Sequence, residues 1–178
     1  YNWVTYLTSV VSLSVMPFIL QHQLGLTAAE YGSVMIIPSA GLMMGSLLLN
    51  VVNRYLDTKQ ILSLAISTMM VAGLWLLVSE VTLFNLVSAF TLLTIAQGLA
   101  TPLSISMLLE PHKRQAGSVS ALSGAVQMCL SGAFGGYLVE HWVQSQMSMG
   151  VFYLISATTM GLVLISSKKL IVAQQKFA

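Results

Sequence analysis

The stretch LFNLVSAFTLLTIAQGLATPLSISMLL, residues 83–109, contains no Asp, Glu, Lys, Arg or His. An α-helix rises about 1.5 Å per residue, so about 20 apolar residues cross the roughly 30 Å of hydrocarbon in a bilayer. A membrane β-strand needs only about ten residues. Lipid offers no hydrogen-bond partner to the backbone, so a spanning segment must satisfy its own N–H and C=O groups. The stretch therefore predicts a transmembrane α-helix.

Apolar runs of similar length follow one another along the whole chain. The composition is 56% hydrophobic and only 7% charged, which leaves too little polar surface to cover a soluble globule. We therefore predict an all-α membrane protein with a cytoplasmic tail at residues 168–178. Its six transmembrane helices are expected at about residues 1–20, 29–50, 61–78, 83–109, 117–139 and 149–167.

The basic residues are confined to alternate gaps between these runs. They form three clusters: Arg54 with Lys59, Lys113 with Arg114, and Lys168, Lys169 and Lys176 after the last run. Because Lys and Arg are retained on the cytoplasmic side of short loops, this pattern predicts that both chain ends face the cytoplasm. Tyr1 lies directly in an apolar run without a charged leader, so we expect the chain to be part of a longer polypeptide.

An internal repeat is indicated when the chain is shifted by 85 positions. Pro17 then falls on Pro102, and the tripeptide Gly-Ser-Val at 32–34 falls on the same tripeptide at 117–119. Further matches are Ala40 with Ala125, Met43 with Met128, and Ser46 with Ser131. A repeat of three helices is odd, so the two units must cross the membrane in opposite senses. Inverted three-helix repeats are typical of transporters, which bind substrate between related units near the midplane.

Residues 110–138, EPHKRQAGSVSALSGAVQMCLSGAFGGYL, resemble one region of a known transporter family. The region is the tenth-to-eleventh helix segment of major facilitator superfamily drug:proton antiporters of the Bcr/CflA type. Five residues of this chain occupy the positions of that family's motif: Ala116, Gly117, Ser118, Ala121 and Gln127. The segment NRYLDTKQ, residues 53–60, looks like the basic loop between the eighth and ninth helices, with fewer Arg residues. The resemblance implies the C-terminal six-helix half of a twelve-helix transporter.

The resemblance also implies a function and a location. It implies multidrug efflux of amphipathic or cationic small molecules across the bacterial inner (plasma) membrane, by alternating access and in exchange for protons. The implied partners are the small-molecule substrate, protons, membrane lipid and the N-terminal six-helix half, with no cofactor. The alternatives are a major-facilitator-type transporter of another small solute, a non-transporting membrane scaffold subunit and, less favoured, a channel.

The expected substrate site lies on the two helices that the resemblance assigns to the central cavity, residues 1–20 and 83–109. Polar and aromatic side chains recur at three- or four-residue steps in both, with Gln97 the least expected because an unsatisfied carboxamide in hydrocarbon costs several kcal/mol. Met side chains adapt to differently shaped ligands, and aromatic faces attract cations. The predicted substrate-binding residues are Tyr6, Ser9, Met16, Phe90, Thr94, Gln97 and Gln127. The structural alternative is helix-to-helix hydrogen bonding, at about 0.6 kcal/mol for each bond.

Glycine and proline positions predict packing and bends. The motifs Gly41-x-x-x-Gly45 and Gly132-x-x-x-Gly136 predict two close approaches between helix backbones. Prolines inside the apolar runs each remove a backbone hydrogen bond and predict a bend. They are Pro17, Pro38 and Pro102.

The ionisable residues argue against several other functions. None of the Asp, Glu, Lys or Arg residues lies near the middle of an apolar run, so we expect the proton site in the N-terminal half. A rhomboid-type protease is the nearest enzyme, but Ser123-Gly124 lacks the preceding glycine of its motif and the His residues lie outside the runs. We therefore predict no catalytic residue and no metal site. The basic pair Lys113 and Arg114 is too small for nucleic-acid binding.

Overall fold

The computed structural model describes the backbone of residues 2–176 and the side chains of residues 2–166. Every regular element in this part of the chain is helical. By length and composition, five helical stretches in it are sufficient to cross a membrane. They are Asn2–Gln23, Ala28–Val52, Thr58–Val78, Leu83–His141 and Gln146–Ser166. The all-helical class, with helices of membrane-spanning length, is therefore confirmed.

The first stretch changes its helix type at a proline. The helix α1 (Asn2–Pro17) continues as the π-helix η1 (Phe18–Gln23). Pro17 has no N–H for the carbonyl four residues earlier, so the regular hydrogen-bond ladder cannot pass through it. Beyond it the ladder is wider, and Leu24 donates its N–H to Ile19 O, five residues back, at 3.2 Å. The structure therefore has a change from α-helix to π-helix at the proline for which a bend was predicted.

The second stretch consists of two helices, α2 (Ala28–Val34) and α3 (Ile36–Val52). They are separated at Met35, where the chain forms a turn. Pro38 lacks the N–H that would bond to Val34 O, so the carbonyl at the end of α2 has no regular partner. The break therefore falls one turn before the proline.

Side chains define where two of these helices begin. Thr27 and Glu30 form a reciprocal capping box before α2, with Thr27 N donating to Glu30 Oε2 at 2.8 Å. Asp57 and Gln60 form a second box at the start of α4 (Thr58–Val78), with Asp57 N donating to Gln60 Oε1 at 2.9 Å. Both boxes satisfy N–H groups that a helix start leaves without partners.

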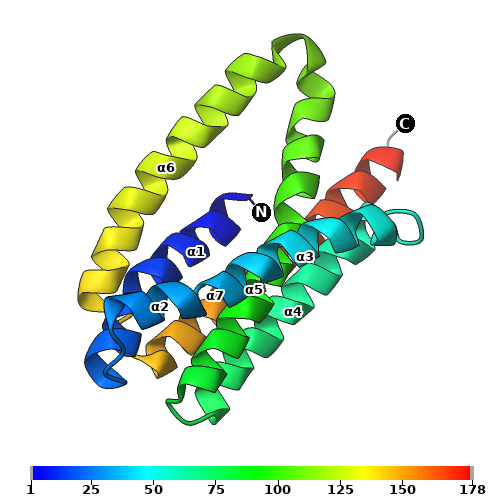
Figure 1. Ribbon diagram of the computed structural model, residues 1–178. Coiled ribbons are helices and arrows are strands. Elements are labelled where there is room, and N and C mark those ends of the chain that lie inside the picture. The colour runs from blue at the N-terminus through cyan, green and yellow to red at the C-terminus, as the bar shows by residue number, and fades with distance from the viewer. Residues whose placement is uncertain (1, 177–178) are drawn as a thin grey trace.

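The fourth stretch contains a sharp turn. The helix α5 (Leu83–Leu109) has the limits predicted from the sequence, and a 3₁₀ turn, η2 (Glu110–Gln115), joins it to α6 (Ala116–His141). His112 within η2 has φ −119° and ψ 32°, which is not helical. Figure 1 shows α6 turning back from this point and diverging from the upper part of α5.

The helices pack in a pattern of pairs. The last helix, α7 (Gln146–Lys176), lies against α4, which also packs on α5. α3 packs against α5, and α6 packs mainly against α1. The predicted start at Tyr1 and the side chains of the predicted tail at 168–178 lie outside the described residues.

The crossing of α3 and α5 is very close. A Cβ atom at Gly45 would lie 2.3 Å from Ile95 O, and one at Gly98 would lie 2.4 Å from Leu42 O. A Cβ atom at Gly41 would meet Thr94 Oγ1 at 2.8 Å. Only glycine fits these positions without a shift of the helices, so the close approach predicted for Gly41-x-x-x-Gly45 is confirmed.

The second glycine motif behaves differently. A Cβ atom at Gly132 or Gly136 would meet nothing within 4 Å among the described residues. α6 instead turns Gly135 toward α1, where the nearest atom to an added Cβ is Val10 Cγ1 at 3.5 Å. The close approach predicted for Gly132-x-x-x-Gly136 is therefore wrong, because both glycines lie on the exposed face of α6 and not on the face that meets α1.

Candidate functional site

A cleft of about 460 Å³ lies between α1, α3 and α5. Five of the seven predicted substrate-binding residues line it: Tyr6, Ser9, Phe90, Thr94 and Gln97. They come from α1 and α5, which the resemblance assigned to the cavity. Met35, at the start of α3, and the ring of Pro38 also line the cleft.

The other two predicted residues lie elsewhere. Met16 is 0% exposed and belongs to the hydrophobic core. Gln127 lies on α6, where its Oε1 accepts a hydrogen bond of 2.6 Å from Asn2 Nδ2. Ser12 of α1 bonds to the buried hydroxyl of Tyr153 on α7 at 2.7 Å. The polar side chains of α1 therefore face three different neighbours: the cleft, α6 and α7.

Gln97 joins α5 to α1 at the cleft. Its side chain is 8% exposed, and its Nε2 donates to Thr5 O at 2.7 Å and to Ser9 Oγ. A carbonyl oxygen only accepts, so the amide nitrogen must face Thr5 and the two ends of the carboxamide are fixed. The donor end of Gln97 is thus satisfied by α1, and Oε1 remains as an acceptor at the cleft.

The α3 wall of the cleft was not predicted from the sequence. On α3, Ser39, Leu42 and Ser46 form this wall. Thr101 of α5 is a further lining residue that was not predicted. The positions 39, 42 and 46 follow steps of three and four residues, so they share one face of a helix. This periodicity is the signal that would have identified them.

The serine hydroxyls of this wall donate their protons to nearby backbone carbonyls. Ser39 Oγ donates to Met35 O at 2.8 Å, and Ser46 Oγ donates to Leu42 O at 3.1 Å. Across the cleft, Thr94 Oγ1 donates to Thr91 O at 2.9 Å. Such bonds to the preceding turn are the usual way in which Ser and Thr satisfy a proton inside a helix.

A proline adds a backbone acceptor to the same region. Pro102 has no N–H, so the carbonyl of Gly98 lacks its regular helical donor. Ser46 Oγ lies 3.5 Å from Gly98 O and partly replaces that donor. The lining residues include no Asp, Glu, Lys, Arg or His, so the cleft is a largely apolar surface whose polar groups carry no formal charge.

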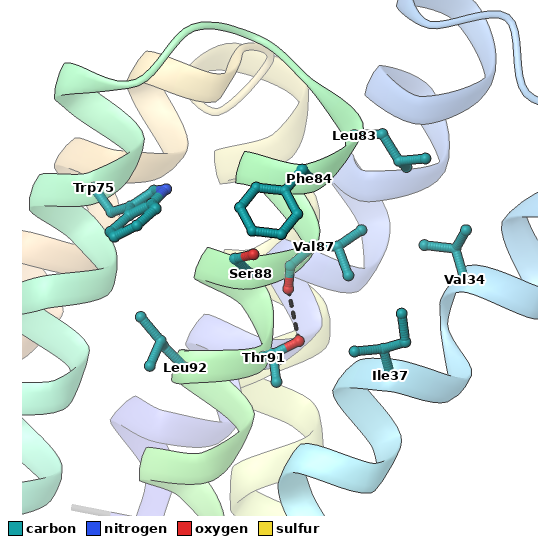
Figure 2. A pocket seen from close by; sticks show the side chains of 9 residues that line it. All are labelled: Val34, Ile37, Trp75, Leu83, Phe84, Val87, Ser88, Thr91 and Leu92. Carbon is teal, nitrogen blue, oxygen red and sulfur yellow. Dashed lines mark hydrogen bonds between the residues drawn. The ribbon is translucent and has the colours of Figure 1, made fainter.

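A second and larger groove, of about 610 Å³, lies on another side of α5. Figure 2 shows its wall of large apolar side chains, which includes Trp75, Phe84 and Ile37. Its hydroxyls are those of Ser88 and Thr91, and Thr91 already donates to Val87 O at 2.7 Å. A solute site combines apolar surface with placed polar groups. The smaller cleft has that combination, so it is the candidate site.

The Ser and His residues considered for a protease or metal site do not form one cluster. Ser123 accepts a hydrogen bond of 3.2 Å from Trp3 Nε1, and His112 and His141 lie near the two ends of α6. Among the described residues, no three His, Cys, Asp or Glu side chains are grouped to hold a metal ion.

Comparison with known proteins finds no matching family model, no matching curated protein and no matching solved structure. The similarity to the antiporters is therefore an interpretation of residues 110–138 and 53–60.

Proposed function

We propose that this chain is the C-terminal six-helix bundle of a major-facilitator-type multidrug efflux transporter, in which the cleft between α1, α3 and α5 binds an amphipathic or cationic small molecule. The cleft itself is the main support. Uncharged polar side chains and two aromatic rings, of Tyr6 and Phe90, line a hollow between helices long and apolar enough to cross a membrane. The geometry suits a solute with both apolar and polar surface.

Helix pairing supports the proposed inverted repeat. We count α1, α2 with α3, and α4 as one unit, and α5, α6 and α7 as the other. The second helix of each unit packs on the first helix of the other, since α3 contacts α5 and α6 contacts α1. The third helices, α4 and α7, pack on each other. A two-fold exchange of the units preserves all three pairings.

The mechanism that we propose is alternating access in the bacterial inner membrane, with both ends of the chain in the cytoplasm and the N-terminal half of the transporter as partner. The cleft of this half contains no carboxylate, so we place the proton site in that partner half. No enzymatic step and no cofactor enter this mechanism.

A scaffold subunit is the second candidate, because several polar groups of α1 are used in packing. Ser12 bonds to Tyr153, and Asn2 bonds to Gln127. These contacts support a structural role for those residues. They do not explain the cleft residues, of which, within the described part of the chain, only Gln97, Ser9 and Ser46 bond to a neighbouring helix. A transporter of another small solute would use the same cleft.

The test is transport by the full-length protein in proteoliposomes with a lipophilic cation as substrate. We expect saturable, gradient-dependent uptake that Thr94→Val and Ser39→Ala reduce, because both remove cleft oxygens. Ser67→Ala is the matched control, since Ser67 is an exposed α4 residue that donates only to Ser63 O at 2.9 Å. Absence of uptake by the unaltered protein, or cleft variants that transport like the control, would refute the proposal.

A further inference from the structure

The polar atoms of the cleft are mostly hydrogen-bond acceptors. Ser39, Ser46 and Thr94 each have one hydroxyl proton, and each donates it to a backbone carbonyl: Ser39 and Thr94 to one of their own helix, and Ser46 to Leu42 O of its own helix and Gly98 O of α5. A carbonyl cannot donate, so the direction of these bonds is fixed. Toward the cleft, the three hydroxyl oxygens therefore offer lone pairs and no proton.

Gln97 adds an acceptor in the same way. Its Nε2 donates to Thr5 O at 2.7 Å and to Ser9 Oγ, so the donor end is already used by α1. Its Oε1 bonds to none of the described residues. Since Gln97 lines the cleft, a ligand there meets the carbonyl end of this carboxamide.

Two prolines also reduce the number of backbone N–H donors near the cleft. Pro17 and Pro102 have no N–H for the carbonyls four residues earlier, which belong to Leu13 and Gly98. Both of these residues line the cleft. The backbone oxygens of these two lining residues therefore lack the regular donor of an α-helix, and Gly98 O has in its place the long contact of 3.5 Å from Ser46 Oγ.

The donors available to a ligand are few. Tyr6, Ser9 and Thr101 are the lining residues whose hydroxyl protons are not already committed to a carbonyl of the described chain. The lining includes no Lys, Arg, His, Trp or Asn. Sites for carboxylate or phosphate groups usually present charged or clustered N–H donors, and this cleft has none of them.

From this imbalance we propose that the cleft selects organic cations that carry at least one N–H donor, such as protonated amines, over quaternary ammonium ions and anions. The inference rests on the proposed function, in which this cleft is the substrate site. An ammonium N–H bonds to the lone pairs of Gln97, Thr94, Ser39 and Ser46, whereas the rings of Tyr6 and Phe90 attract any cation. A quaternary ion keeps the ring contacts and loses the hydrogen bonds.

The test compares two ligands that differ by one N–H group. One is a lipophilic tertiary amine in its protonated form, and the other is its N-methylated quaternary analogue, which has the same charge and apolar body. Affinities for the full-length protein in proteoliposomes are measured by competition against transport of a lipophilic cation. We expect the quaternary analogue to bind about 10-fold more weakly, which is the usual effect of losing one hydrogen bond to a charged donor.

Variants separate this selectivity from general damage. Ser39→Ala and Thr94→Val are expected to bring the ratio of the two affinities closer to one, because they remove acceptors that only the protonated amine uses. Ser67→Ala is expected to leave the ratio unchanged. A variant that merely folds poorly lowers transport of both ligands and leaves their affinity ratio as it is.

Three results would overturn the inference. Equal affinities for the two ligands, or preference for the quaternary ion, would refute the selectivity and leave the proposed function intact. A ratio that stays unchanged in the acceptor variants would place the selectivity outside this cleft. Lack of binding of both cations would refute the proposed function together with the inference.

Discussion

Two helices of this protein carry the same glycine motif and meet their neighbours in opposite ways. On α3, Gly41 and Gly45 bring the backbone against α5, where an added Cβ at Gly45 would lie 2.3 Å from Ile95 O. On α6, Gly132 and Gly136 meet nothing within 4 Å among the described residues. The difference lies in the face of the helix that carries the motif. Gly45 faces α5, which presents Gly98 at the crossing. Gly132 and Gly136 lie on the exposed face of α6, and this helix meets α1 through Gly135.

This difference has a consequence for the candidate site. The close crossing of α3 and α5 holds Ser46 within 3.5 Å of Gly98 O and forms one wall of the cleft. α6 lies outside that wall, and its Gln127 bonds to Asn2 of α1. A glycine motif therefore permits a close crossing only where its face of the helix meets a neighbour, and the motif alone does not show whether it does.

The largest effect is expected from Gly45→Ala. Alanine favours a helix by about 1 kcal/mol over glycine, but here the methyl group would overlap a backbone oxygen that cannot rotate away. Overpacking costs about 1–3 kcal/mol. Because the overlap here is with the backbone, we expect the upper end of that range, and the helix gain of about 1 kcal/mol leaves a net loss of about 2 kcal/mol in the free energy of unfolding. Chemical unfolding of the purified protein in detergent measures it.

Gly136→Ala on α6 is the matched control. The added methyl group meets open space, so the free energy of unfolding should stay unchanged or rise by up to about 1 kcal/mol. Equal destabilisation by the two variants would contradict the contrast between the two helices.

The next effect tests the bonds that hold the cleft together. Gln97→Leu removes both bonds from Nε2 to α1 and leaves Thr5 O without that donor, and we expect a loss of about 1.5 kcal/mol. Gln127→Leu, which breaks the bond of α6 to α1, serves as comparison and should cost about 0.6 kcal/mol. Unfolding curves recorded for both proteins in the same detergent provide the comparison. A larger effect at Gln127 would show that α6 is held more firmly than its few contacts indicate.

A smaller effect is expected at the buried contact between α1 and α7. Ser12 donates its proton to Thr8 O at 2.6 Å, so in the bond of 2.7 Å between Ser12 and Tyr153 the tyrosine is the donor. Tyr153→Phe keeps the ring and removes this one bond. We expect a loss of about 1 kcal/mol in the free energy of unfolding. Tyr137→Phe, an exposed tyrosine on α6, is the control and should leave the unfolding curve unchanged.

The helix limits that depend only on local sequence could be predicted. The limits of α5 follow from a run without charges that ends at Glu110, and they agree with the structure at both ends. The break at Met35 was not located, because a proline indicates a bend but the exact position depends on which carbonyl loses its donor. The turn η2 and the pairing of helices depend on contacts between residues far apart in the sequence. The periodicity of apolar residues gives no information about such contacts.

The candidate site was predicted in part for a related reason. Helical spacing placed Ser9 on the face that lines the cleft, and Leu13, four residues later, lines it too. Met16, seven residues after Ser9, lies only about 20° from it around an ideal helix, on the side of Ser12, and yet it is buried in the core. A stripe of polar residues shows that a helix has polar neighbours, but it does not show which face meets which neighbour.

The smallest expected effect tests the link between α6 and α1. Asn2 Nδ2 donates to Gln127 Oε1 at 2.6 Å, and a double-mutant cycle with Asn2→Ala and Gln127→Ala isolates this bond from the other roles of each residue. We expect a coupling of about 0.6 kcal/mol, the average for such bonds in a membrane bundle, because the unfolded chain in detergent also finds partners for both amides. A coupling well above about 1.7 kcal/mol, the upper end for these bonds, would mean that this contact holds α6 in place. The weak packing of its glycines would then be compensated by a polar anchor, and the contrast with α3 would lie in the kind of contact and not in its strength.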